Sequence, residues 1–424
     1  MKVLIVNTSE QTGGAAVAAN RLKVALNNNG IEANMLVRDR LSDDETVFVI
    51  KNNWCTRWNR LWERWCIFWH LHFSKRNLFA IDIANAGTDI TELQVFKDAD
   101  VIHLAWINQG MLSLKSIEKI LKSGKPLVWT MHDIWPATAV CHITLDCRKF
   151  ESQCKQCRLL PSGIGRDLAK QTWKRKEAIE GRTHIIYITC SKWLQGEAKQ
   201  SALIGQNTIE CIPNPIDTNV FRKVDKAEAR RKLGLPADKR LILFASQRVT
   251  NHNKGMSYLV DACRKMAEQH PEMLENTAVV VLGGHAEDLR EQFNLPMIPL
   301  GYVSDTQKIV DVYNAIDVFV TPSLSDNLPN TVMEAMACGV PCVGFKVGGI
   351  PEMIDHERNG YVVKMKDSTD LATGIHWVLN VADYEMLSAE AVEKVKQCYS
   401  QAQVAAQYIA VYEKALANSK TKEV

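Results

Sequence analysis

Two acidic residues eight positions apart stand in the stretch of sequence that is richest in chemistry. Residues 322–354 read PSLSDNLPNTVMEAMACGVPCVGFKVGGIPEMI, with Asp326 in a polar turn and Glu334 two turns inside the helix expected to follow. This spacing puts both carboxylates on one side of a pocket, while the free amides at the start of the helix face an anion. Alternatively, Asp326 or Asn327 caps the helix and Glu334 lies on the surface. The apolar run after Glu334 favours a buried carboxylate, which needs a partner.

Cations and glycines follow two other expected strands. Arg248 and Lys254 come after LILFASQ, and Lys254 with Gly255 opens the next helix, where two cations suit a diphosphate. Gly13 and Gly14 follow the first strand, in an arrangement that lets backbone N–H groups approach an anionic or hydroxylated ligand. The alternatives are solvated surface cations and glycines that only turn the chain.

Four of the twelve cysteines gather within seventeen residues. Cys141, Cys147, Cys154 and Cys157, with His142 adjacent, have spacings that allow a structural zinc site, although the first spacing of six is looser than in zinc ribbons. Free thiols in a loop are the alternative. Twelve cysteines in a chain without an export signal indicate a reducing cytoplasm, so we expect no disulfides.

Residues 52–77, NNWCTRWNRLWERWCIFWHLHFSKRN, hold five of the eleven tryptophans, interleaved with arginines. On a helix, they fall within an arc of roughly 80°. This tryptophan face comprises Trp54, Trp58, Trp62, Trp65 and Trp69. One interpretation is that the face and its flanking cations dock on an anionic membrane surface. The other is that the tryptophans fill the core of their own domain.

The elements that position these residues alternate between strand and helix. The runs VLIVNTSE, ADVIHLAW, PLVWTMHD and HIIYITCS predict one parallel sheet flanked by helices, and the pattern restarts with LILFASQ. At 424 residues, two doubly wound α/β domains are expected. We place them at 1–208 and 209–395, with 396–424 a helix and tail that packs back toward the first domain. Ligands of such sheets bind outside the carboxyl ends of the strands.

The composition is that of an ordinary globular protein. Hydrophobic residues make up 46%, charged residues 23%, and the net charge is +3. This balance gives no reason to expect disorder or a nucleic-acid-binding surface. The first apolar run reads as a buried strand rather than a signal peptide, and we expect no transmembrane span.

Residues 322–354 resemble the signature of the group 1, or family 4, retaining glycosyltransferases, in which two acidic residues eight apart precede A-C-G-x-P and G-G-x-P-E. The segments ADVIHLAW, TMHDIWP, TCSKWL, CIPNPIDTNVF and LGYVSD occur in the family's order, so the resemblance covers nearly the whole chain. Within the family, SDNLPNT and WPATAVCH are similar to a colanic-acid-type subgroup that builds bacterial capsular or exopolysaccharides.

The resemblance implies a GT-B type fold, two facing Rossmann-like domains with an interdomain cleft, and roles for particular residues. Glu334 would hold the ribose of the donor and Asp326 a hydroxyl of the transferred sugar. Arg248 and Lys254 would neutralise the diphosphate, and His132 would approach the donor sugar. The residues expected to contact the donor are Gly13, Gly14, Val303, Asn327, Leu328, Pro329, Asn330, Thr331 and Glu334.

The resemblance further implies a retaining, metal-independent hexosyltransferase that moves a sugar from a UDP- or GDP-sugar to a lipid-linked glycan at the inner face of the cytoplasmic membrane. Fixed cations and a helix N-terminus stabilise the departing diphosphate without a metal. Two positions depart from the family: Asp326 stands where Glu is common, and Ala105 where relatives often carry His. A nucleotide-sugar epimerase of the same fold and a non-catalytic sugar-nucleotide-binding or scaffold protein are the alternatives.

Overall fold

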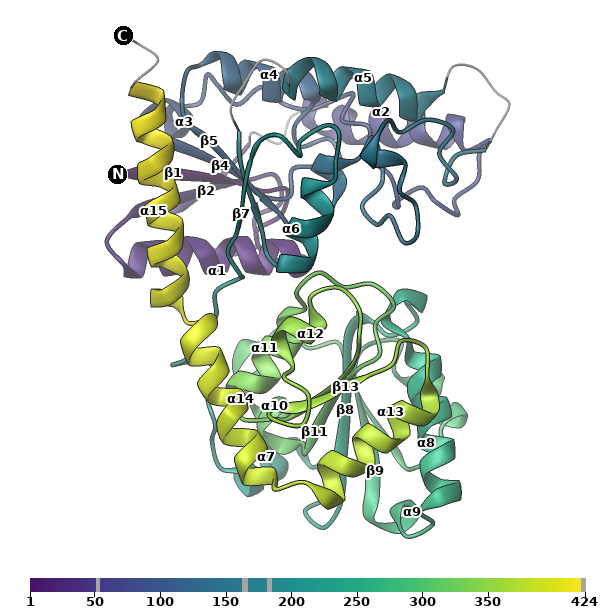
Figure 1. Ribbon diagram of the computed structural model, residues 1–424. Coiled ribbons are helices and arrows are strands. Elements are labelled where there is room, and N and C mark those ends of the chain that lie inside the picture. The colour runs from purple at the N-terminus through teal and green to yellow at the C-terminus, as the bar shows by residue number, and fades with distance from the viewer. Residues whose placement is uncertain (51–53, 162–166, 181–184, 421–424) are drawn as a thin grey trace. The chain divides into compact units, whose positions relative to one another are not determined.

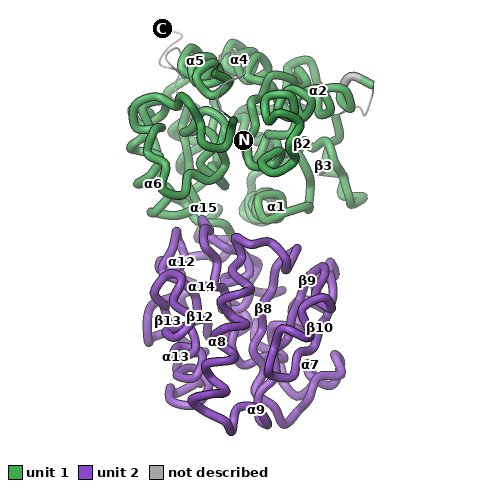
Figure 2. Tube along the Cα trace, turned by 90° about the vertical axis from the view of Figure 1, so that its right-hand side faces the viewer, with its two compact units in different colours: residues 1–215, 404–424 green, residues 216–403 purple. Residues whose placement is uncertain are grey.

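The computed structural model describes residues 1–50, 54–161, 167–180 and 185–420, and it divides into two compact units (Figure 2). Unit 1 comprises Met1–Pro215 and Val404–Val424, and unit 2 comprises Ile216–Gln403. The boundaries thus fall after residues 215 and 403, whereas the sequence suggested 208 and 395. The C-terminal segment of the chain belongs to the same unit as the N-terminus.

The described part of unit 1 contains a parallel sheet of seven strands in the order β3-β2-β1-β4-β5-β6-β7. The strands are β1 (Lys2–Val6), β2 (Glu32–Val37), β3 (Val47–Val49), β4 (Val101–Leu104), β5 (Leu127–Met131), β6 (Ile186–Thr189) and β7 (Thr208–Cys211). Continuous apolar runs such as LVWTM in β5 form strands that are buried on both faces, as expected where helices cover a parallel sheet. The strand order reverses direction between β1 and β4.

Helices connect these strands (Figure 1). They are α1 (Gly14–Asn28), α2 (Trp54–His70), α3 (Gln94–Asp98), α4 (Leu114–Lys122), α5 (Leu168–Glu180), α6 (Lys192–Lys199) and α15 (Gln401–Lys420), with 3-10 turns η1 (Trp135–Ala137) and η2 (Lys149–Glu151). Tyr408 and Tyr412 of α15 are buried in the same hydrophobic cluster as Ile5 of β1 and Leu22 of α1. The end of the chain therefore completes the core of unit 1.

The tryptophan face of α2 points away from that core. Its side chains are between 43% and 87% exposed, whereas Thr56, Glu63 and Ile67 on the opposite face are buried. Glu63 anchors the helix by accepting hydrogen bonds from the backbone N–H groups of Ile83 and Ala84, at 3.0 and 2.7 Å. The interpretation that the tryptophans fill the core is therefore wrong, because their side chains are exposed and the opposite face of the helix is the buried one.

The described part of unit 2 contains a parallel sheet of six strands in the order β10-β9-β8-β11-β12-β13. The strands are β8 (Arg240–Arg248), β9 (Thr277–Gly284), β10 (Met297–Gly301), β11 (Val318–Thr321), β12 (Cys342–Phe345) and β13 (Gly360–Val363). Here the order reverses direction between β8 and β11.

The helices of unit 2 cover both faces of this sheet. They are α7 (Lys226–Leu233), α8 (Met256–Gln269), α9 (Met273–Asn276), α10 (Thr306–Ala315), α11 (Asn330–Ala337), α12 (Ile350–Met353), α13 (Ser368–His376) and α14 (Tyr384–Cys398), with 3-10 turns η3 (His252–Lys254) and η4 (Glu287–Gln292) and a π-helical turn η5 (Trp377–Val381). Among the described helices of the two units, none is long and apolar enough to cross a membrane.

Candidate functional site

The reversal of strand order in unit 2 brings three predicted site residues to one edge of the sheet. From β8 the chain continues to β9 on one side, and from β11 it continues to β12 on the other, so the loops after β8 and β11 diverge. Such a switch point is where ligands of open α/β sheets bind. Arg248 is the last residue of β8, Lys254 ends the following turn η3, and Asp326 lies in the loop after β11.

Lys254 and Asp326 form an ion pair at this switch point. The Lys254 Nζ lies 2.6 Å from Asp326 Oδ2, with the carboxylate largely buried. Two glycines, Gly255 and Gly348, allow neighbouring backbone segments to approach the loop after β11 closely. Gly255, at φ +72°, has a missing Cβ that would lie 1.9 Å from the carbonyl oxygen of Pro322, and the Cβ of Gly348 would lie 1.7 Å from that of Asp326. The geometry of the acidic loop therefore requires glycine at both positions.

Glu334 is buried within α11. The Tyr313 hydroxyl of α10 donates a hydrogen bond of 2.9 Å to its Oε2 atom. The interpretation that places Glu334 on the surface is therefore wrong. So is the interpretation that Asp326 or Asn327 caps the helix, because Pro329 occupies the N-cap without a side-chain hydrogen bond.

The remaining predicted donor contacts of unit 2 occupy two places. Asn327, Leu328 and Pro329 lead directly into α11, whose first residues are Asn330 and Thr331, so this group adjoins the ion pair in sequence and at the sheet edge. Val303 instead follows β10, the outermost strand, two strands away from β8. Arg248 is exposed, while Leu328 and Pro329 are buried.

Three predicted residues belong to unit 1. Gly13, at φ +93°, is the N-cap of α1 and Gly14 its first residue, at the carboxyl end of β1. His132 directly follows β5 and lines a small cavity with His103 and Tyr408. Burial lowers the pKa of His132 to about 4, so its imidazole is neutral at neutral pH and serves as a hydrogen-bonding group rather than as a cation.

Sequence reasoning missed a polar chain in unit 1 beside His132. The two ring nitrogens of His142 lie 2.8 Å from Asp133 Oδ2 and 2.6 Å from Asp82 Oδ2, and Asp82 also pairs with Arg64 of α2. The indole N–H of Trp106 donates to Asp133 Oδ2 at 2.9 Å. No local pattern indicates this polar chain, because its members are up to 78 residues apart in the sequence, from Arg64 to His142.

This polar chain has two consequences. Burial by itself raises the pKa of the Asp133 carboxyl, but His142 and the N–H donors outweigh burial and hold that pKa below its usual value. His142 stands next to Cys141 in the sequence, but both of its ring nitrogens face carboxylates rather than the cysteine cluster.

The four clustered cysteines are free thiols, and Cys141 and Cys154 are buried. Burial raises the pKa of the Cys141 thiol to about 12 and that of Cys154 to about 11, which favours protonated thiols. Across the described ranges, the group of three ligand atoms within 4.8 Å of one another is His270, Glu272 and His376, and the cysteines are not part of such a group. Zinc binding by Cys141, Cys147, Cys154 and Cys157 stays a prediction.

The chain is similar to known glycosyltransferases. Residues 239–381 match the family described as "Glycosyl transferases group 1". The uncharacterized glycosyltransferase MJ1607 of Methanocaldococcus jannaschii is 28% identical over 80% of this chain and 91% of that protein. D-inositol 3-phosphate glycosyltransferase 2 of Catenulispora acidiphila is 32% identical over 39% of this chain and 42% of its own length, so the match spans less than half of that relative.

A solved structure shows the same fold. HepE of Anabaena in complex with UDP superposes with a TM-score of 0.65 at 18% identity, covering 98% of this chain and all of that chain. The predicted fold class of two parallel-sheet, Rossmann-like α/β domains, as in GT-B glycosyltransferases, is therefore confirmed. The family match and the relatives support glycosyltransferase activity of the group 1 type.

Proposed function

We propose that this chain transfers a sugar from a nucleotide diphosphate donor to a glycan acceptor, as a group 1 glycosyltransferase. The observation that carries the proposal is the Lys254–Asp326 pair at the switch point of unit 2. It lies within 239–381, the part of the chain that matches the family. A cation and a carboxylate held side by side suit a diphosphate next to a hydroxylated sugar.

Each residue of this edge has a role in the proposal. Lys254 and Arg248 neutralise the diphosphate, and the first amides of α11 add the positive end of the helix. Asp326 accepts a hydrogen bond from a hydroxyl of the transferred sugar while it holds the Lys254 ammonium in place. The buried Glu334 carboxylate accepts hydrogen bonds from the ribose, and Tyr313 fixes its orientation. A UDP-sugar is the donor we favour, because HepE is similar in fold and was solved with UDP.

We assign the retaining, metal-independent course to the reaction. The bond between the anomeric carbon and the diphosphate oxygen breaks, and the acceptor oxygen bonds to that carbon on the same face. The leaving diphosphate takes the proton of the acceptor hydroxyl, so no carboxylate base is needed. Fixed cations act most strongly as charge develops on the leaving group, which is the kind of preorganised electrostatics that lowers barriers.

The acceptor in this proposal is a lipid-linked glycan of bacterial capsule or exopolysaccharide synthesis. The exposed tryptophan face supports this choice, since tryptophan favours the membrane–water interface. Arg57, Arg60, Lys75 and Arg76 are also exposed near it, and cations there favour the anionic inner leaflet of the cytoplasmic membrane. Peripheral docking by α2 would bring unit 1 to an acceptor that cannot leave the lipid.

The test is a transfer assay with a panel of nucleotide sugars, chosen first by thermal shift. With the best donor, Lys254→Ala should lower turnover by on the order of 10²-fold, as loss of one preorganised charge contact does. The matched control is Lys308→Ala, which removes an exposed lysine from α10 of the same unit. Turnover of Lys254→Ala close to that of the control would refute the assigned site, and no stabilisation by any nucleotide sugar would refute the function.

A further inference from the structure

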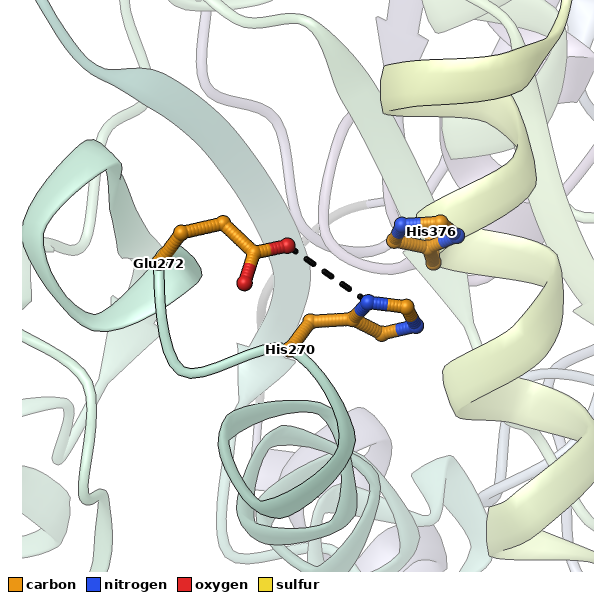
Figure 3. Close-up of side chains that lie close together, drawn as sticks. All are labelled: His270, Glu272 and His376. Atoms are coloured by element: carbon orange, nitrogen blue, oxygen red, sulfur yellow. Dashed lines mark ion pairs between the residues drawn. The ribbon is translucent and has the colours of Figure 1, made fainter.

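Unit 2 carries a second cluster of chemically active side chains, at the opposite end of its strands from the Lys254–Asp326 pair (Figure 3). His270 directly follows α8, Glu272 lies two residues later, and His376 ends α13, which packs against α8. One ligand atom from each residue lies within 4.8 Å of the other two. Because this segment precedes β9, it lies at the amino end of the strands, whereas Lys254 and Asp326 lie at the carboxyl ends.

We propose that His270, Glu272 and His376 bind a divalent transition-metal ion, for which Zn²⁺ is the natural probe. Two imidazoles and one carboxylate are a donor set that suits Zn²⁺ and its neighbours, while Mg²⁺ and Ca²⁺ prefer oxygen ligands alone. The ion joins α8 to α13 and stabilises unit 2. Three protein ligands leave a fourth position for water.

The surroundings prepare the histidines for a cation. His270 follows the last residue of a fourteen-residue helix, where the helix dipole favours positive charge. Glu272 supplies the negative charge: its Oε1 lies 3.5 Å from His270 Nδ1.

Binding requires one ring to turn. The two imidazoles are stacked (Figure 3). Their centroids lie 3.7 Å apart, and their planes are 8° from parallel. A nitrogen lone pair lies in the plane of its ring, so two parallel rings cannot both direct lone pairs at one ion. The side chains of His270 and Glu272 are 35% and 64% exposed, which leaves them room to turn toward His376. The ion then replaces the direct contact between His270 and Glu272.

The experiment is a titration of the full chain with Zn²⁺, followed by calorimetry and by melting temperature. Zn²⁺ should raise the melting temperature of the wild type and should not raise it in His270→Ala or His376→Ala. Glu272→Gln changes an exposed carboxylate and leaves folding intact, and it should bind Zn²⁺ at least about tenfold more weakly, since loss of even an outer-shell partner has that effect. The matched control is His285→Asn, because His285 pairs with Asp288 on the surface without being part of such a group of three.

The absorption spectrum of bound Co²⁺ distinguishes binding at this site from binding at the cysteines. Nitrogen and oxygen ligands give only weak visible bands, whereas thiolates add intense ultraviolet charge-transfer absorption. We expect the weak bands in the wild type and their loss in His376→Ala. Equal Zn²⁺ affinity in the wild type, Glu272→Gln and His376→Ala, or a Co²⁺ spectrum made of thiolate bands alone, would overturn the proposal. Donor binding should be unchanged in Glu272→Gln, so the result is independent of the proposed transferase function.

Discussion

At the scale of single residues, the candidate donor site is built from charges that already have partners. Lys254 pairs with Asp326, and Glu334 accepts a hydrogen bond from Tyr313. Partners of this kind offset the cost of partly burying polar groups and hold them in one geometry. A donor would therefore meet preoriented groups rather than flexible surface side chains.

Glu334→Gln should weaken the binding of UDP. The substitution keeps the shape of the side chain but replaces a charged acceptor by a neutral one, and hydrogen bonds to charged groups are roughly twice as strong. We expect a loss on the order of tenfold in affinity, measured by calorimetry. Tyr313→Phe is the control, since it removes one hydrogen bond and leaves the carboxylate. If Glu334→Gln binds UDP as the wild type does, Glu334 has a structural role.

At the scale of elements, one face of α2 attaches the helix to its unit and the other face exposes the tryptophans. The buried face makes polar contacts with the rest of unit 1. Glu63 accepts a hydrogen bond from the backbone N–H of Ile83. The Arg64 guanidinium donates to the carbonyl of Leu78 at 2.6 Å and pairs with Asp82. The tryptophan face is left out of the core: Trp58 and Trp62 stack on each other, and Trp65 and Trp69 contact the exposed Phe73. Five large apolar side chains kept in water are costly unless they have another surface to contact.

The triple substitution Trp58→Ser, Trp62→Ser and Trp65→Ser should abolish sedimentation with liposomes that contain anionic lipid. The melting temperature should stay close to that of the wild type, because the three side chains are 43% to 59% exposed. Trp173→Ser is the contrasting variant: Trp173 is 1% exposed, and its loss should cost about 3–5 kcal/mol of stability. Retained sedimentation in the triple variant would remove the membrane from the proposed function.

At the scale of the whole molecule, the chain closes unit 1 with its last helix. The Tyr412 hydroxyl of α15 lies 2.5 Å from Nδ1 of His103 in β4, and Thr130 of β5 lies 2.8 Å from the other ring nitrogen. His103 is fully buried, and burial followed by the charge of His132 lowers its pKa to about 3. The attachment of α15 therefore depends on a neutral imidazole.

This attachment predicts a loss of stability in acid. Between pH 6.5 and about 3, the unfolded chain binds a proton at His103 that the folded chain does not, so the free energy of unfolding falls as pH falls through this window. The contribution is at most about 1.4 kcal/mol per pH unit. Urea unfolding at pH 7.5 and pH 5 should show a smaller difference for His103→Gln than for the wild type. Equal differences would mean that His103 is already charged in the folded protein.

Local sequence determined much of this protein. Strand-and-helix alternation predicted two α/β domains, because buried parallel strands need continuous apolar runs such as LVWTM. The position of Arg248, Lys254 and Asp326 directly after strands indicated one ligand-binding edge, since the carboxyl ends of parallel strands meet there. The 100° spacing alone also placed the five tryptophans on one helical face.

Only the tertiary structure decided which face of a helix is buried and which is exposed. Periodicity gives a helix an apolar stripe but does not say whether the stripe points inward, and α2 is attached instead by Glu63 and Arg64. Some contacts join residues up to 309 positions apart in the sequence. They are the contacts of His142 with Asp82 and Asp133, of His103 with Tyr412, and of His270 with His376. Such contacts are set by how sheets and helices stack, and side chains so far apart in the chain carry no shared local pattern from which their meeting could be predicted.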